Sequence, residues 1–103
     1  MSKMLLTTRF NYSMSTEILK KIMPVAAPEF SEIHGCIWKI WLINEDHKEA
    51  GGVYLFKSAT DLEVFLNSDL FASVTQNPYF SNLQTNTFGI EEEASRITGG
   101  PLV

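Results

Sequence analysis

The chain has a single cysteine, Cys36, among its 103 residues. A lone thiol excludes an intrachain disulfide, and its presence without a partner suits a reducing compartment, so we expect a cytoplasmic protein. Long apolar runs are also missing, because no stretch approaches the roughly 20 residues that a membrane-spanning helix needs. The first residues, Met-Ser-Lys-Met-Leu-Leu, hold no apolar segment long enough for a secretory signal peptide. The sequence therefore predicts no membrane partner and no secretion.

Positive charge is scarce as well. Eight Lys and Arg residues stand against 12 Asp and Glu residues, which gives a formal net charge of −4, and the basic residues form no cluster. Such a surface repels a phosphate backbone, so nucleic acid is not expected as a partner. Hydrophobic residues make up 45% of the chain, which is ordinary for a folded protein. We expect one domain over residues 1–103, with a single core.

The most informative stretch is residues 35–57. Its two apolar runs, 36–43 and 53–56, flank a charged break at 45–49, and this pattern predicts two antiparallel strands joined by a hairpin. Alternation along the first strand places Cys36, Trp38, Ile40 and Leu42 on one face, and Ile37, Lys39, Trp41 and Ile43 on the other. Both faces are thus apolar. A chain this short cannot cover both with its own helices, so a second copy, in a homodimer, is the simplest partner.

Helical spacing appears in two places. Ile18, Leu19, Ile22 and Met23 recur on one side of a helix that Ser13 or Ser15 caps. Pro24 and Pro28 are expected to kink or segment this helix, since proline removes a backbone donor. A second helix starts at the capping-box-like residues 58–61, is interrupted at 67–69 and ends with a short helical turn at 70–74.

Two further strands are predicted, at residues 4–10 and 80–90. The last one is unusually polar, which favours the edge of a sheet or the wall of a wet cavity. The tail after residue 90 is expected to wrap a partner or to fray. The order of elements, β-α-β-β-α-β, predicts the α+β ferredoxin-like fold, an antiparallel sheet with helices on one face.

Three polar side chains in apolar strands are candidate catalytic groups: Tyr54, Lys39 and Arg9. A buried hydroxyl or charge needs a partner, and these groups could orient the oxyanion or phenolate of a ligand. For the charged residues, snorkelling or pairing with Glu49 across the dimer explains them equally well. Trp38 and Trp41, together with Tyr54, are candidate walls of a ligand cavity. Alternatively, one tryptophan packs in the core and the other makes a dimer contact.

Other motifs are weaker. Gly51 and Gly52 lead into a strand rather than a helix, so we expect a bulge or a close backbone approach there and no phosphate loop. His34 with Cys36 superficially resembles a base and a nucleophile, and Asp46, His47 and Glu49 in the hairpin turn are side chains able to bind metal. The first pair is interpreted as structural and the second group as solvated. No metal site is predicted.

The hairpin also carries a resemblance. Trp-Lys-Ile-Trp at residues 38–41, followed by Glu-Ala-Gly-Gly-Val-Tyr-Leu-Phe at 49–56, resembles the YdhR family of proposed monooxygenases, in the dimeric α/β-barrel superfamily. The resemblance implies a homodimer in which two sheets pack face to face. It also implies oxidation of a small aromatic substrate in an apolar cavity, with oxygen and without a cofactor. It transfers no individual catalytic residue. The alternative is a non-catalytic dimer that binds a small hydrophobic molecule as a carrier, sensor or stress protein.

Overall fold

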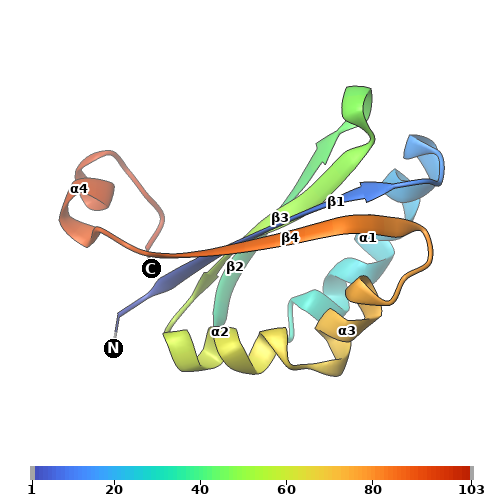
Figure 1. Cartoon of the computed structure of the whole chain (residues 1–103). Helices are drawn as coiled ribbons and strands as arrows, with labels where there is room; N and C mark the ends of the chain where they lie inside the picture. Colours follow the sequence, from blue (N-terminus) through green and yellow to red (C-terminus); the bar gives the residue numbers. More distant parts are fainter. Residues whose placement is uncertain (1, 103) are drawn as a thin grey trace.

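The computed structural model describes residues 2–102. Its elements are β1 (Met4–Tyr12), α1 (Thr16–Phe30), β2 (Cys36–Asn44), the 3-10 turn η1 (Glu45–His47), β3 (Glu49–Phe56), α2 (Ala59–Leu66), α3 (Asp69–Thr75), β4 (Phe80–Gly89) and α4 (Glu92–Ile97). The strands form one antiparallel sheet in the order β2-β3-β1-β4. Helices α1, α2 and α3 lie on one face of it (Figure 1). This confirms the predicted ferredoxin-like α+β fold.

The helices begin where the sequence provides caps. Ser15, Ser58 and Ser68 each accept a hydrogen bond from the backbone N–H three residues ahead, at 3.1–3.2 Å. This bond satisfies one of the free donors of the first helical turn. As predicted, the Asn-Ser-Asp sequence at residues 67–69 separates α2 from α3.

The two prolines were expected to kink or segment α1, and the segmentation does not occur. Pro24 and Pro28 lie inside one continuous helix. Each proline leaves one carbonyl without its N–H donor, on Lys20 and on Pro24. Both of these residues are exposed, so water can satisfy the freed carbonyls, and the helix continues.

A bulge in β2 corrects the predicted sorting of its faces. The pairing of β2 with β3 shifts between Cys36 and Trp38, so Cys36 pairs with Phe56 while Lys39 pairs with Tyr54. The extra residue reverses the alternation on one side of the bulge. Cys36 therefore lies on the helix-covered face with Lys39 and Trp41, and no longer with Trp38. Farther along the strand the alternation holds, and the two tryptophans lie on opposite faces.

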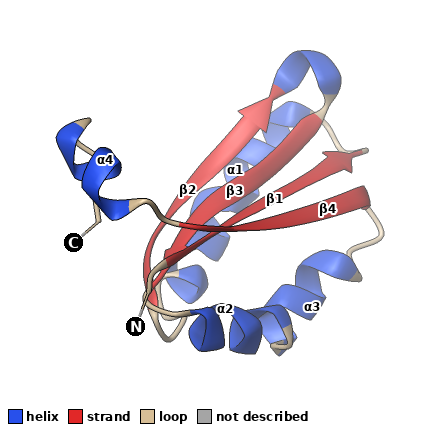
Figure 2. Ribbon diagram, turned by 60° about the vertical axis from the view of Figure 1, so that its left-hand side comes forward, coloured by secondary structure: helices blue, strands red, loops and turns tan. Residues whose placement is uncertain are grey.

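The C-terminal segment neither frays nor extends away from its own sheet. The indole N–H of Trp38 donates to the carbonyl of Pro101 at 2.8 Å, and Leu102 is buried. In Figure 2, α4 and the chain end lie near β2, on the side of the sheet away from α1. This segment covers one end of the sheet face that the other helices leave open. Within residues 2–102, no helix has the length and apolarity to cross a membrane.

Candidate active site

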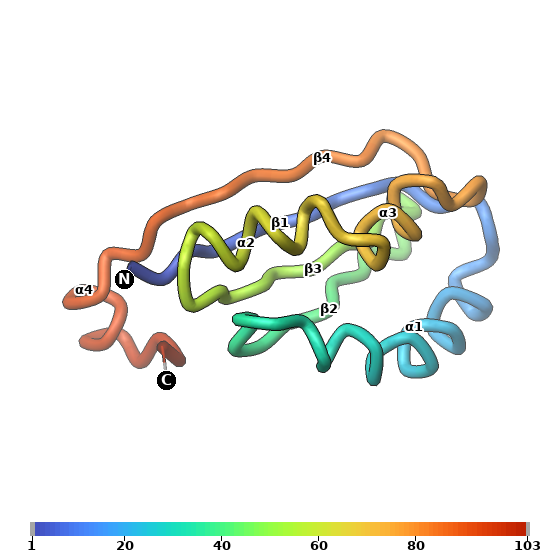
Figure 3. The backbone as a smooth tube through the Cα atoms, turned by 90° about the horizontal axis from the view of Figure 1, so that it is seen from below, coloured from blue at the N-terminus to red at the C-terminus, as the bar shows by residue number. Residues whose placement is uncertain are grey.

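A cavity of about 170 Å³ lies between the helix-covered face of the sheet and helices α1 and α3. In Figure 3, α1 and the α2–α3 pair run in two separate rows over the sheet. Aromatic rings make up much of the wall: Phe10, Phe30, Trp41, Tyr54, Phe71 and Phe80. Few polar groups interrupt this surface, as is usual in sites for small apolar ligands.

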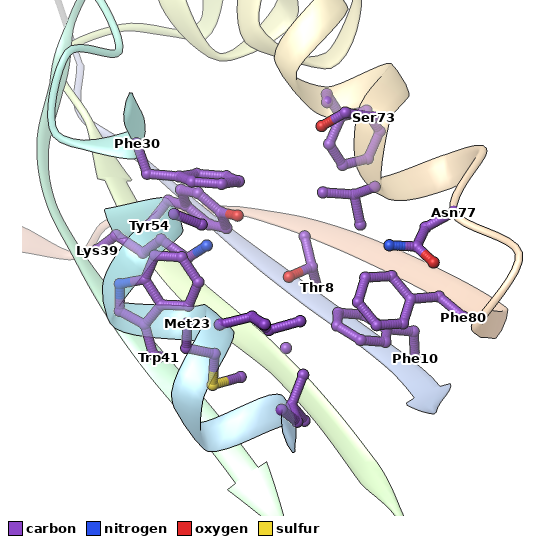
Figure 4. A pocket seen from close by; sticks show the side chains of 16 residues that line it. Thr8, Phe10, Met23, Phe30, Lys39, Trp41, Tyr54, Ser73, Asn77 and Phe80 are labelled. Atoms are coloured by element: carbon purple, nitrogen blue, oxygen red, sulfur yellow. The ribbon is translucent and has the colours of Figure 1, made fainter. Parts of the chain in front are cut away.

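Lys39 is the one charged residue among those that line the cavity. Its Nζ lies 3.4 Å from the ring centroid of Trp41, 3.7 Å from that of Phe30 and 4.7 Å from that of Tyr54. Figure 4 shows these four side chains gathered at one end of the cavity, with Phe10 and Phe80 at the other end and Thr8 between. No carboxylate of the described chain forms an ion pair with this amine. The cavity thus has one basic end and one apolar end.

The glycines of β3 make room for this arrangement. A side chain at Gly52 would bring its Cβ within 2.7 Å of Lys39 Cε, and one at Gly51 would lie 1.9 Å from the carbonyl oxygen of Thr8. Both contacts are too short for a real Cβ. The predicted close approach at this glycine pair is therefore confirmed, and the approaching groups are a neighbouring strand and the Lys39 side chain.

Burial shifts the titration of both polar groups at the basic end. It lowers the pKa of Lys39 to about 7 from the ordinary value of 10.5, and the negative charge of a Cys36 thiolate would counteract this shift. Burial also raises the pKa of Tyr54 well above its usual range, with a hydrogen bond to Thr8 acting in the opposite direction. Near neutral pH the cavity therefore holds an amine that can accept a proton and a phenol that keeps its own.

Two further polar residues of the cavity wall each make a local hydrogen bond. Ser73 Oγ donates to the carbonyl of Leu70 at 2.5 Å, and Asn77 Oδ1 accepts from the N–H of Tyr79 at 2.9 Å. Lys39, Tyr54 and Thr8 are left as the groups best placed to meet a ligand.

The structure brings together some of the predicted site residues and separates others. Lys39, Trp41 and Tyr54 meet at the cavity. Arg9 lies on the opposite, open face of the sheet, where its Nε is 3.2 Å from Glu49 Oε2. Trp38 is also on that face and donates to the C-terminal segment. Sequence reasoning missed Thr8 and the rings from β1, α1, α3 and β4, since only packing between these elements brings them to the hairpin.

The side chains considered for metal binding or thiol chemistry lie outside this cavity. His34 Nε2 is 3.6 Å from Asp61 Oδ1, and no three His, Cys, Asp or Glu side chains cluster around a common point in residues 2–102. Burial raises the pKa of the Cys36 thiol, which disfavours the reactive thiolate.

Known protein structures share the fold of this chain. No curated protein matches the chain by sequence. A protein of unknown function from Nitrosomonas europaea, NE2512, is 17% identical with a TM-score of 0.74, over 88% of this chain and 91% of its own. SnoaB, a cofactor-independent oxygenase from Streptomyces nogalater, is 12% identical with a TM-score of 0.70, over 89% of this chain and 96% of its own. MupZ from Pseudomonas fluorescens is 16% identical with a TM-score of 0.69, over 96% of this chain and 81% of its own.

At such identities these structures show a shared fold and nothing more specific. The family is shown by a sequence model described as "Putative mono-oxygenase ydhR", which matches residues 5–101. The resemblance of the hairpin is thereby confirmed, and the chain belongs to the ydhR family.

Proposed function

We propose that this protein is a homodimeric oxygenase that oxidises a small electron-rich aromatic compound with O₂ and without a cofactor. The observation that carries the proposal is the aromatic cavity with Lys39 and Tyr54 at one end. Membership of a family described as mono-oxygenases and the shared fold of SnoaB, a cofactor-independent oxygenase, support the same chemistry.

The cavity groups fit the steps that such an oxidation needs. The neutral amine of Lys39 takes a proton from the substrate, and the hydroxyl of Tyr54 donates a hydrogen bond to the oxyanion that forms. The resulting anion is electron-rich enough to reduce O₂ itself. With a ring CH₂ group, as in anthrone, one oxygen atom then replaces two hydrogens as a carbonyl, and the other leaves as water. With a single-ring quinol, one oxygen atom enters at a ring carbon to give a hydroxyquinone, and the other leaves as water. Trp41 and Phe30 would hold the ring, and the aromatic wall of the cavity would limit the access of bulk water.

The open face of the sheet supports the homodimeric part of the proposal. Ile40, Leu42 and Phe88 project from it and are 51%, 44% and 53% exposed. The face also carries a shallow hollow of about 410 Å³, lined by Leu42 together with Arg9 and Glu49. A second copy of the same sheet would cover this face, as a self-complementary interface requires.

Oxygen uptake by metal-stripped protein tests the chemistry. A cavity of about 170 Å³ is close to the roughly 150 Å³ that holds one benzene ring, so single-ring quinols should be assayed beside anthrone. We expect Lys39→Met to lower kcat at least about 100-fold, the lower end of the usual contribution of a general base. Tyr54→Phe should lower kcat about tenfold and change KM little, because its hydrogen bond strengthens as the anion forms.

The exposed Lys21→Met is the matched control and should leave turnover unchanged, since Lys21 is on the outer side of α1. Background oxygen uptake across the panel would reject the oxygenase. If the same compounds still quenched tryptophan emission saturably, the result would favour the carrier function instead.

A further inference from the structure

The amine of Lys39 is held inside the cavity in an unusual way for a lysine. Its Nζ is surrounded by the rings of Trp41, Phe30 and Tyr54 at 3.4–4.7 Å from their centroids. Among the described residues it has no carboxylate partner and no hydrogen bond to the protein. A buried cation usually has such a partner, so this amine is free to react with a molecule in the cavity.

The surroundings favour the neutral, nucleophilic form of this amine. Burial lowers the pKa of Lys39 to about 7, whereas an exposed lysine with a pKa near 10.4 is almost fully protonated at that pH. The titratable groups that face it are Tyr54 on β3 and Cys36 on its own strand. The residues of α1, α3 and β1 that line the cavity carry no titratable group.

The hydroxyls beside the amine complete the requirements for carbonyl chemistry. Tyr54 stays protonated because burial raises its pKa, and its side chain lies within the same aromatic cluster as Lys39. It can therefore donate a proton to a leaving oxygen. Thr8, which is buried at 6% exposure, lines the cavity with Tyr54 and adds a second hydroxyl to it.

We infer that the cavity captures small aromatic aldehydes covalently, as an imine on Lys39. The nitrogen lone pair attacks the carbonyl carbon, the C=O π bond breaks, and a carbinolamine forms as a proton moves from nitrogen to oxygen. Tyr54 then donates a proton to the hydroxyl of the carbinolamine, the C–O bond breaks, water leaves, and the nitrogen lone pair forms the C=N bond. The N–H proton of the resulting iminium returns to the Tyr54 phenolate, which restores the phenol and leaves a neutral imine. No electrons are exchanged, so no oxidant or reductant is needed. This activity does not depend on the proposed oxygen chemistry.

The cavity selects the aldehyde by size and by shape. Its volume of about 170 Å³ admits one ring with a short substituent, by comparison with the roughly 150 Å³ that holds benzene. The ring would lie toward Phe10 and Phe80, at the end of the cavity away from Lys39, while the formyl carbon points toward Lys39 (Figure 4). Benzaldehyde is the simplest molecule that meets both conditions.

Reductive trapping tests the inference. Protein at pH 7 is incubated with benzaldehyde, reduced with borohydride, digested and mapped by mass spectrometry. The neutral fraction at pH 7 differs by roughly three orders of magnitude between Lys39 and an ordinary lysine. We therefore expect Lys39 to gain one benzyl group at least about tenfold faster than any other lysine.

Controls separate cavity capture from general amine labelling. Excess benzyl alcohol, which has the ring but no carbonyl, should slow labelling of Lys39 and leave the chain's α-amino group unaffected. Lys39→Met should lose the adduct, and Lys21→Met should keep it. Gly52→Ala retains the lysine but places a Cβ within 2.7 Å of Lys39 Cε, so it should reduce labelling severalfold.

Three results would overturn the inference. They are equal labelling of Lys39 and the exposed lysines, labelling of Lys39 that benzyl alcohol does not slow, and unchanged labelling in folded Gly52→Ala. Each is read on the peptide map of wild-type or variant protein without any oxygen assay. Failure of the capture is thus distinguishable from failure of the oxygenase.

Discussion

Burial of Lys39 destabilises the folded state, although the same residue supplies the amine of the cavity. Its ammonium has left water without gaining a carboxylate, which destabilises the folded state. The three aromatic rings around Nζ recover part of this cost, because their faces attract a cation. A residue that destabilises a structure and still lies beside a cavity is a common sign of a functional site.

This cost predicts a dependence of stability on pH. The folded pKa of Lys39, about 7, lies below the ordinary 10.5, so between these values the unfolded chain binds more protons. Stability should therefore rise with pH from about 7 upward, by at most about 1.4 kcal/mol per pH unit, and the penalty is complete below pH 7. In Lys39→Met this contribution is absent.

Urea unfolding of the wild type and of Lys39→Met at pH 7, 8 and 9 gives the free energy of unfolding of each protein. The contribution of Lys39 is the change with pH in the difference between these two free energies. The raised pKa values of Tyr54 and Cys36 lower the free energy of unfolding at high pH, opposite to Lys39. Both residues are present in the wild type and in the variant, so their contributions largely cancel in the difference. Parallel pH profiles for the two proteins would contradict the buried, easily deprotonated amine.

At the scale of single elements, the hairpin shows what a sequence pattern can and cannot predict. The apolar alternation of β2 predicts a strand with two buried faces, and it places Trp38 and Trp41 on opposite sides correctly. It cannot predict the bulge after Cys36, because a bulge depends on how the partner strand pairs. The glycine pair predicts a close approach, yet only the register reveals that Lys39 approaches Gly52.

The cavity was predictable only in part for the same reason. Lys39, Trp41 and Tyr54 belong to one hairpin, so local pairing brings them together. The opposite end of the cavity comes from residues far apart in sequence, such as Phe10, Phe80 and Val74. Their meeting depends on how α1 and α3 pack on the sheet, which no local pattern encodes.

The hydrogen bond between Trp38 and the C-terminal segment can be tested by substitution. Trp38→Phe keeps an aromatic ring but removes the N–H that bonds Pro101. We expect a loss of about 1 kcal/mol in the stability of that attachment, which hydrogen exchange should report as faster exchange confined to residues 92–102. Tyr79→Phe, at an exposed position, is the control. If exchange in the segment stayed unchanged, the hydrogen bond would not be what holds it.

The molecule as a whole is covered on one side of its sheet and only partly on the other. Helices α1 to α3 cover one face, whereas the C-terminal segment reaches one end of the other (Figure 2). The uncovered part carries Ile40, Leu42 and Phe88, each more than two-fifths exposed. Exposed apolar groups gathered on one face are typical of an interface.

Covering this face with a second copy predicts a dimer that one substitution can separate. Stable interfaces of this kind often bury roughly 2,000 Å² or more, and a carboxylate buried there without a partner is strongly unfavourable. Leu42→Asp, on the open face, should therefore convert a dimer into a monomer in sedimentation at micromolar concentration. Val25→Asp, at an 81% exposed position of α1, should remain a dimer. A wild-type protein that sediments as a stable, folded monomer under these conditions would show that the open face has another role.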